Sequence, residues 1–186
     1  VSILVRSDCK PGRTQATITG AVQAPVFTLG KTTERDWNAR VKNAPGAWGY
    51  IETAKWPGYI PREVLQKVDR PQEVAKYWQR VVDTADEFMG YAKWRRPGGA
   101  VLTDRDIVPG YGHAGNPVMM AYAGEKGEGP AALVERGPQK GDWGFLHELG
   151  HTFQDSFDSN YTIATHAEVD VNLVPAIAKM LIHDRT

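Results

Sequence analysis

Two histidines and one glutamate near the C-terminal end of the chain have the residue types and spacing of a catalytic metal site. They are His147, Glu148 and His151, in the pattern His-Glu-x-x-His. On a helix, four residues correspond to about 400° of rotation, so both imidazoles lie on one face and can share a metal ion. Glu148 lies between them, placed to accept a proton from metal-bound water. Metalloproteases use this pattern with Zn²⁺ as Lewis acid and glutamate as general base. The alternative is a solvated amphipathic helix whose histidines have this spacing by chance.

A catalytic zinc usually has three protein ligands and one open position. The metzincin pattern requires a glycine and a histidine three and six residues after His151, but Gln154 and Phe157 occupy these positions. That class is excluded. The other downstream candidates for a third ligand are Asp155, Asp158, His166, Glu168, Asp170, His183 and Asp184. The first two aspartates follow His151 too closely for the chain to leave the helix and return to the metal.

Glu168 is the favoured third ligand. Residues 165–182 predict a second helix, and Glu168 near its start can face the first helix. His166 is about 200° away on such a helix, so at most one of the two faces the metal. Asn172 shares the face of Glu168 and is expected beside the ligands. The alternative is a capping box of Glu168 with Thr165. The predicted apolar stripe of this helix is Val169, Leu173, Ala176, Ile177, Met180 and Leu181.

Alternating and β-branched segments predict strands in the first two thirds of the chain. Residues 1–30 have this character, and further strands are predicted at 47–52, 100–108 and 118–123. Residues 109–117 are predicted to be a glycine-rich turn that carries His113. Turns next to strands commonly line clefts, although a lone histidine in a loop more often has no function.

Spacing of apolar residues predicts a long amphipathic helix that begins near Asp69 and Pro71 and ends at Gly90. A short helix is predicted after Thr32 and Thr33. Residues 124–142 are predicted to be a loop because they are rich in glycine and proline, and Asp142 is the expected N-cap of the helix with the two histidines. The expected buried stripe of the long helix is Val74, Tyr77, Trp78, Val81, Val82, Ala85, Phe88 and Met89.

The composition restricts the class of protein. A length of 186 residues predicts a single domain, and the start at Val1 rather than methionine indicates a processed or excised chain. Acidic and basic residues number 22 each, so no charge pattern indicates nucleic acid or an anionic membrane as partner. A single cysteine, Cys9, excludes an internal disulfide and a thiolate metal site. The sequence contains no apolar run of membrane-spanning length.

With these motifs the chain resembles the peptidase M60 family of enhancin and mucinase-like gluzincins. That family has His-Glu-x-x-His followed, after a variable spacer, by a glutamate ligand, and here sixteen residues separate His151 from Glu168. The resemblance extends from about Val26 to Ala178. Segments similar to family signatures are Phe27–Thr33 with Trp37, Ala44–Trp48, Gly110–Met119 and Gly141–Gly144.

The chain departs from the family pattern at three positions: Ala114, Asn116 and Thr152 stand where serine, an aromatic residue and asparagine are common. None of them is a metal ligand or the base, so the departures concern substrate preference. The chain also ends soon after the second helix, whereas family members often continue into a larger helical lobe.

The resemblance implies a zincin-like α+β fold. In this fold a mixed sheet packs on helices, one helix bears His-Glu-x-x-His, and the next bears the glutamate ligand. It also implies a secreted or cell-surface zinc metallopeptidase of O-glycosylated, mucin-type proteins, which we expect to be a monomer. His147, His151 and Glu168 would bind Zn²⁺, and Glu148 would be the general base. The residues assigned to substrate binding are Trp143, Asp142, His113 and Asn172.

Two other functions remain open from the sequence. The first is a non-catalytic module of the same family that binds glycan or protein, because an intact motif does not guarantee turnover. The second is an aminopeptidase-type gluzincin, but the chain has no motif resembling Gly-x-Met-Glu-Asn.

Overall fold

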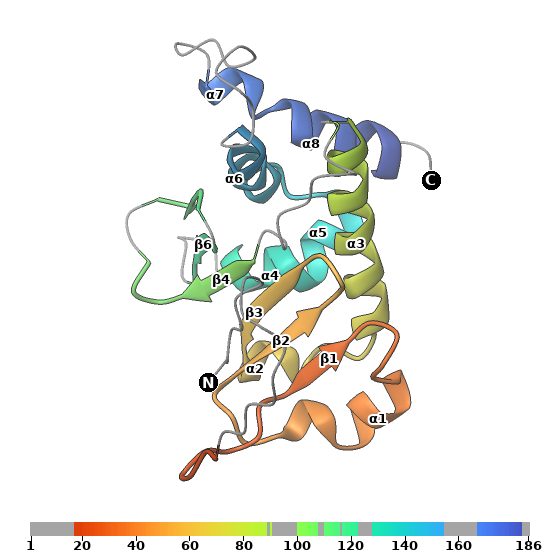
Figure 1. Ribbon diagram of the computed structural model, residues 1–186, viewed down its shortest axis with the longest axis vertical. Coiled ribbons are helices and arrows are strands. Elements are labelled where there is room, and N and C mark those ends of the chain that lie inside the picture. Colours follow the sequence, from red (N-terminus) through yellow and green to blue (C-terminus); the bar gives the residue numbers. More distant parts are fainter. Residues whose placement is uncertain are drawn as a thin grey trace, which may run out of the picture.

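The computed structural model describes residues 17–88, 90, 100–107, 110–115, 117–122, 128–154 and 167–183. Within these residues, six strands form one mixed sheet in the order β1-β2-β3-β4-β6-β5 (Figure 1). The pairs β2–β3 and β5–β6 are antiparallel, and the other neighbours are parallel. The strands are β1 (Val26–Thr28), β2 (Trp48–Glu52), β3 (Pro57–Pro61), β4 (Val101–Asp104), β5 (Gly112–His113) and β6 (Val118–Ala121).

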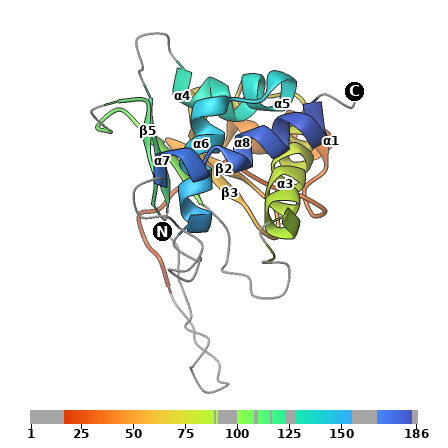
Figure 2. The ribbon, with the colours of Figure 1, turned by 90° about the horizontal axis from the view of Figure 1, so that it is seen from above.

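Two helices matter most for the position of the candidate site: the long α3 (Pro71–Phe88) and α6 (Trp143–Gln154). Helix α6 contacts β5 and β6 on one side and α8 on the other, and Figure 2 shows it between these elements. None of the described helices is both long and apolar enough to cross a membrane. The remaining helical segments are α1 (Glu34–Ala39), η1 (Val41–Asn43), α2 (Arg62–Leu65), α4 (Glu128–Ala131), η3 (Ala132–Arg136), α5 (Gly137–Lys140), α7 (Ala167–Asp170), α8 (Leu173–Ala178) and η4 (Lys179–His183).

The hydrophobic core lies between the sheet and helices α3 and α6. Alternate strand residues such as Phe27, Ile51 and Ile60 are fully buried, as the two-residue period of a strand requires. The ring of Trp78 in α3 stacks on that of Trp56, with the ring centroids 5.0 Å apart. It meets the ring of Phe145 in α6 edge-on, with the centroids 4.6 Å apart. The buried face of α6 is Phe145, Leu146, Leu149 and Phe153. This packing turns the face with His147, Glu148 and His151 toward the surface.

Several predictions for the first two thirds of the chain are confirmed. The predicted strand at 47–52 is β2, and the long helix ends before Gly90, whose φ of +77° is left-handed. The predicted stripe of α3 is buried except for Phe88, which is 55% exposed, while Met89 lies outside the described residues. The strands predicted at 100–108 and 118–123 are the shorter β4 and β6.

The strands differ from the predictions in three places. Within residues 1–30 the predicted strand at Val26–Thr28 is confirmed as β1, residues 17–25 are not a strand, and residues 1–16 lie outside the described part. The predicted turn at 109–117 contains β5, because Gly112 and His113 pair with β6. Strand β3 was not predicted, because prolines at both its ends argue against a strand. Those prolines nevertheless occupy the terminal positions of the β2–β3 register.

The predicted loop at 124–142 is wrong for residues 128–140, which are helical. Ala132, Leu133 and Val134 are buried there, and Leu133 accepts a hydrogen bond of 2.8 Å from Trp78 Nε1. A side chain at Gly137 would collide with Ala132 O and approach Trp78 to 3.1 Å. The glycine therefore serves close packing rather than a turn.

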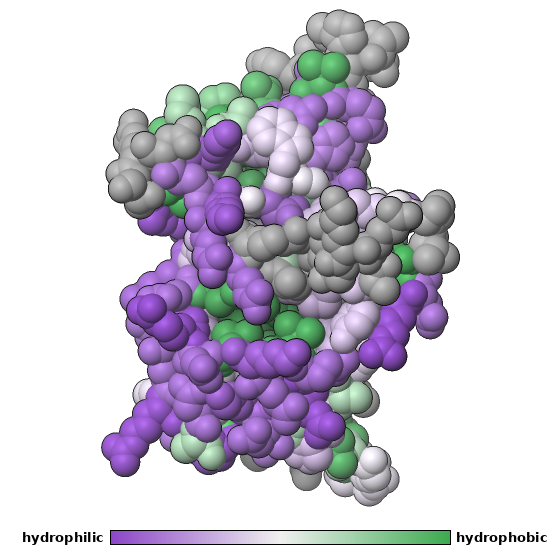
Figure 3. Space-filling view, turned by 180° about the vertical axis from the view of Figure 1, so that it is seen from behind, coloured by the Kyte–Doolittle hydropathy of each residue, from purple (hydrophilic) through white to green (hydrophobic). Residues whose placement is uncertain are grey.

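The predicted helix at 165–182 is divided into α7, α8 and η4, with a turn at 171–172. Pro175 lacks the N–H that would bond the carbonyl of Val171, so a continuous helix is interrupted one turn earlier, at 171–172. The break rotates the buried face, and the predicted stripe is wrong except for Ile177. Val169, Leu173 and Met180 are 65%, 47% and 55% exposed. Figure 3 shows apolar surface at the top of the molecule, the end where Figure 1 places α7 and α8. The residues buried instead are Val171, Val174, Pro175, Ala178 and Ile182.

A partly buried ion pair joins the β2–β3 turn to α3. Lys55 Nζ donates to Asp86 Oδ2 at 3.1 Å and also contacts Asp83. Burial by itself would lower the pKa of Lys55, but the hydrogen bonds and charges of the two aspartates outweigh it and raise the pKa. Asp86 is 3% exposed, so Lys55 neutralises a carboxylate that is almost fully buried.

We expect Lys55→Met to lower the free energy of unfolding by about 3 kcal/mol at neutral pH, because it removes a cation bound to the buried carboxylate of Asp86. The stabilisation is fully present below the pKa of an unfolded lysine and is lost as pH rises through the raised folded-state pKa. Urea unfolding at pH 7 and at strongly alkaline pH checks this. The control is Lys42→Met, because Lys42 pairs with Asp69, whose side chain is 76% exposed. Equal losses in the two variants would contradict the prediction.

Candidate metal and catalytic site

The N-terminus of α6 is fixed by an aspartate that caps the helix and by a tyrosine. Asp142 Oδ1 accepts the backbone N–H of Phe145 at 2.9 Å, which confirms the predicted N-cap. The same oxygen accepts the hydroxyl of Tyr111 at 2.6 Å. The Tyr111 ring lies against Gly144, where an added Cβ would be 2.7 Å from Tyr111 Cε1. The segment before β5 therefore determines where the histidine helix begins.

We expect Tyr111→Phe to lower the free energy of unfolding by about 1 kcal/mol, because it removes one partly buried hydrogen bond and keeps the ring against Gly144. Chemical denaturation measures this loss. Tyr122→Phe is the control, because the Tyr122 hydroxyl bonds Glu63 at 2.7 Å on the surface. A Tyr111→Phe protein no less stable than this control would show that the tyrosine does not support the cap.

Three side chains that can bind a metal lie together on the face of α6 that is turned away from the core. His147 and His151 come from α6 and Glu168 from α7, and one ligand atom of each lies within 4.8 Å of the others. His147 Nε2 is 3.2 Å from Glu168 Oε2, and His151 Nε2 is 3.6 Å from Glu168 Oε1. Both Nε2 atoms therefore face one carboxylate. Two imidazole nitrogens and a carboxylate oxygen form a donor set that fits a catalytic zinc.

The three side chains differ in exposure. The histidines are 21% and 18% exposed, whereas Glu168 is 78% exposed. The imidazole rings lie 5.0 Å apart and nearly perpendicular, as expected for residues one helical turn apart. The two histidines are thus held largely within the protein, whereas the Glu168 side of the group is open to solvent. This opening leaves room for a further ligand.

Glu148 lies against the backbone of β5. A Cβ added to Gly112 would be 3.3 Å from Glu148 Cγ and 2.6 Å from Met120 Sδ. Glycine at this position therefore allows the strand to approach the carboxylate side chain closely. Strand β5 is the last in the sheet, and within the described residues no strand pairs with its outer side.

Side-chain amides occupy the other nitrogen of each imidazole. His147 Nδ1 is 3.0 Å from Asn172 Oδ1, and His151 Nδ1 is 2.8 Å from Gln154 Oε1. Sequence reasoning missed Gln154 and Tyr111. Gln154 could have been found, because it follows His151 by three residues on the same helix. Tyr111 could have been found from its place in the segment Gly110–Met119, which is similar to a family signature.

A close approach between α6 and the α7–α8 turn places Glu168. An added Cβ at Gly150 would lie 2.5 Å from the carbonyl oxygen of Val171. Because the residue directly before His151 is glycine, the backbone of the α7–α8 turn packs directly on α6. Asn172 follows immediately and donates from Nδ2 to the carbonyl of Glu168 at 2.7 Å.

Other predicted candidates do not join this group. His113 lies on β5, next to Gly112, and Asp170 lies on α7. His183 Nε2 lies 3.3 Å from the hydroxyl of Tyr77, whose pKa is raised by burial and by the charge of Asp142. The remaining candidates, Asp155, Asp158, His166 and Asp184, and the departure at Asn116 lie outside the described residues.

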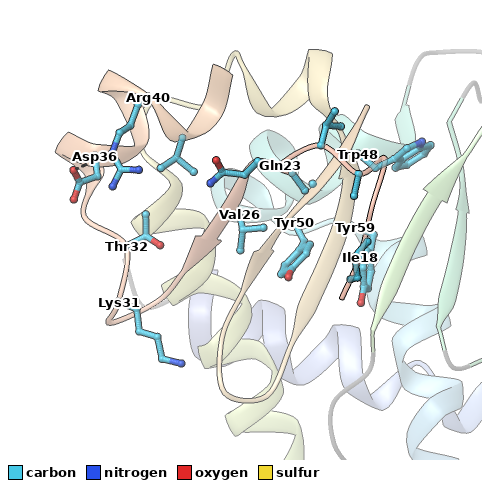
Figure 4. Close-up of a pocket in the computed structure, with 15 residues that line it drawn as sticks. Ile18, Gln23, Val26, Lys31, Thr32, Asp36, Arg40, Trp48, Tyr50 and Tyr59 are labelled. Carbon is cyan, nitrogen blue, oxygen red and sulfur yellow. Dashed lines mark ion pairs between the residues drawn. The ribbon is translucent and has the colours of Figure 1, made fainter. Parts of the chain in front are cut away.

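Two hollows in the described structure lie away from the histidines. Figure 4 shows the first, about 720 Å³, which includes Trp48, Tyr50 and Tyr59 on the sheet and residues of α1. The second, about 680 Å³, lies between α3, α5 and η4 and includes Tyr77 and His183. Neither contains a residue of the histidine–glutamate group. The group lies at the surface where α6, α7 and β5 meet.

Comparison with known proteins gives a consistent result. A family model described as peptidase M60, enhancin and enhancin-like, matches residues 20–185. A TRPM8 channel-associated factor homolog from Danio rerio is 30% identical over 155 residues, which are 83% of this chain and 17% of that protein. The chain thus spans about a sixth of the length of the curated relatives it matches.

Solved structures of low sequence identity share the fold. The M60 catalytic domain of Clostridium perfringens ZmpC, in complex with the sialyl T antigen, matches with a TM-score of 0.64 and 20% identity. The match covers 86% of this chain and 33% of that chain. A metallopeptidase in complex with Tn antigen matches with a TM-score of 0.67 and 18% identity, over 85% of this chain and 29% of that chain.

Proposed function

Because the chain belongs to the peptidase M60 family of enhancin and enhancin-like proteins, we propose that it is a zinc-dependent endopeptidase of O-glycosylated, mucin-type proteins. The observation that carries this proposal is the arrangement of His147, His151 and Glu168 within 4.8 Å of one another. Glu148 on the same helix completes the set of residues that peptide hydrolysis requires.

The chemistry follows from the residue types. Bound zinc would supply a Lewis acid that lowers the pKa of water and polarises the scissile carbonyl. His147, His151 and Glu168 would hold it. Glu148 accepts the proton of the attacking water and passes it to the leaving amine. No side chain forms a covalent bond to the substrate in this mechanism.

Strand β5 supports an extended peptide as substrate. Its outer edge is unpaired within the described residues, and a peptide can add to such an edge through backbone hydrogen bonds. A peptide paired with Gly112 and His113 would lie beside Glu148, because an added Cβ at Gly112 would be 3.3 Å from Glu148 Cγ. A substrate that passes along an open edge need not end there, which favours internal cleavage.

The glycan requirement is proposed by analogy with the two sugar-bound structures. Trp143 is 53% exposed at the start of α6 and offers a ring to a sugar, and His113 lies on the strand beside Glu148. We assign both to substrate binding. Asp142 and Asn172, also predicted to contact substrate, already bond within the protein. A mucin-type substrate would place the protein outside the cell or on its surface.

The test combines metal analysis with product mapping. The purified chain should contain about one zinc per molecule and should cleave an O-glycosylated peptide, with loss of cleavage in a chelator and recovery on addition of zinc. The same peptide without sugar is the control for the glycan requirement. Full zinc occupancy with no cleavage of any glycopeptide would contradict the endopeptidase assignment.

A second candidate is a non-catalytic module that binds glycan or protein. The likeness to a TRPM8 channel-associated factor homolog favours it, because that name describes association with a channel rather than peptidase activity. Such a module would bind a glycopeptide and leave its peptide bonds intact, with or without zinc.

A further inference from the structure

An asparagine between α7 and α8 contacts both helices that carry the histidine–glutamate group. Asn172 Oδ1 lies 3.1 Å from Trp143 Nε1 and 3.0 Å from His147 Nδ1. Its amide nitrogen donates to the carbonyl of Glu168 at 2.7 Å. One side chain therefore connects the start of α6, the first histidine and the backbone of the glutamate. We refer to Trp143, Asn172 and His147 together as the amide triad.

The hydrogen-bond chemistry of the triad permits one orientation of the amide. An indole nitrogen can only donate, so the amide atom that faces Trp143 must be the oxygen. A carbonyl can only accept, so the atom that faces Glu168 must be the nitrogen. Rotating the amide by 180° would place two donors together at Trp143 and two acceptors together at Glu168. Both neighbours thus select the same orientation.

This orientation determines the tautomer of His147. Because the oxygen of Asn172 accepts, Nδ1 of a neutral His147 must carry the proton, which leaves the lone pair on Nε2. That nitrogen is the one that faces Glu168, at 3.2 Å. His147 is therefore held with Nε2, the nitrogen that would bind the metal, directed at the Glu168 carboxylate. Gln154, the partner of His151, lies three residues after it on α6 itself.

We infer that Trp143 and Asn172 are positioning residues of the metal site: Trp143 orients the Asn172 amide, which fixes the tautomer and direction of His147. The inference rests on the metal site proposed above and deepens it. It also gives Trp143 a role that does not depend on contact with a sugar. The two residues act through His147 and take no part in bond making or breaking.

The first measurement is the tautomer of His147 in the metal-free protein. The chain has five histidines, so long-range ¹H–¹⁵N correlation spectra can separate their ring nitrogens. We expect a proton on Nδ1 of His147 in the wild type and a shift toward Nε2 in Asn172→Leu. Asn172→Asp, which keeps an acceptor at this position, should restore the Nδ1 proton. A structural role alone would not predict this rescue.

The second measurement is zinc affinity by competition with a coloured chelator. Asn172→Leu should weaken binding by about 10- to 100-fold, as loss of a partner of a ligating histidine does. Trp143→Phe should weaken it by about twofold to tenfold, because one hydrogen bond that orients the amide is lost. Asn172→Asp should bind zinc more tightly than Asn172→Leu, because it keeps the acceptor for His147, but less tightly than the wild type, because it loses the donor to the Glu168 carbonyl.

Matched controls repeat the same chemical changes elsewhere. Asn38→Leu removes an amide whose nitrogen donates to the carbonyls of Glu34 and Asp69, and Trp48→Phe changes another exposed indole. Neither should change the tautomer or the affinity. Wild-type affinity with an unchanged tautomer in Asn172→Leu would overturn the inference. Failure of the wild type to bind zinc would instead overturn the proposed function, while the tautomer would still test the triad.

Discussion

Replacing Glu148 with glutamine is expected to lower the turnover of a glycosylated peptide by about 10²- to 10⁴-fold while zinc stays bound. Glutamine has nearly the same shape as glutamate but cannot accept the proton of the attacking water. Glu148 is outside the group of three side chains that face one another, so the donor set is unchanged. The loss should appear in kcat more than in KM, because substrate binding does not require a base.

Two further variants make this result specific. His147→Ala removes one of the three donors, so it should lose zinc as well as activity. Glu135→Gln makes the same exchange at an exposed glutamate of η3 and should change neither. Zinc content is measured on the same samples that are assayed for cleavage. Turnover near the wild-type rate in Glu148→Gln would remove Glu148 from the mechanism.

Replacing Gly150 with alanine should destabilise the protein and weaken zinc binding together. The added Cβ would lie 2.5 Å from the carbonyl oxygen of Val171, and a backbone atom can move away only if the α7–α8 segment moves. We expect a cost of about 1 to 3 kcal/mol in unfolding free energy from this overpacking. Alanine is otherwise the better helix residue by about 1 kcal/mol, so any net loss underestimates the clash.

The control is a glycine with the same kind of neighbour elsewhere. An added Cβ at Gly49 in β2 would collide with the carbonyl oxygen of Pro25. Gly49→Ala should therefore also lower stability, but its folded form should bind zinc with wild-type affinity. Calorimetry gives the stability of both variants, and chelator competition gives their affinity. If Gly150→Ala binds zinc as tightly as Gly49→Ala, the position of Glu168 does not depend on this contact.

The residues with strong local chemistry could be predicted from the sequence. The spacing of His147 and His151 defines a face of a helix without reference to the rest of the chain, and Asp142 is a typical N-cap. Glu168 was predicted from its position and from family resemblance. The structure places it beside both histidines, with one ligand atom of each of the three side chains within 4.8 Å of the others.

The errors have a common physical origin, because they concern residues whose role depends on distant neighbours. Gly112 and Gly137 indicated turns in the sequence. In the structure, their lack of a side chain allows the close approach of Glu148 to Gly112 and of Trp78 to Gly137. The two-residue strand β5 exists only because β6 pairs with it. The apolar stripe of 165–182 assumed one continuous helical phase, which the break before Pro175 changes.

Helix α7 has four residues, too few for a helix to persist by itself in water. Its place is set by the turn packed on Gly150 and by the hydrogen bond from Asn172. An ion shared by His147, His151 and Glu168 would add a cross-link between α6 and this short segment. Part of the free energy of metal binding would then appear as folding free energy of the C-terminal region. In the metal-free chain, α7 should therefore open more readily than α6 or α8.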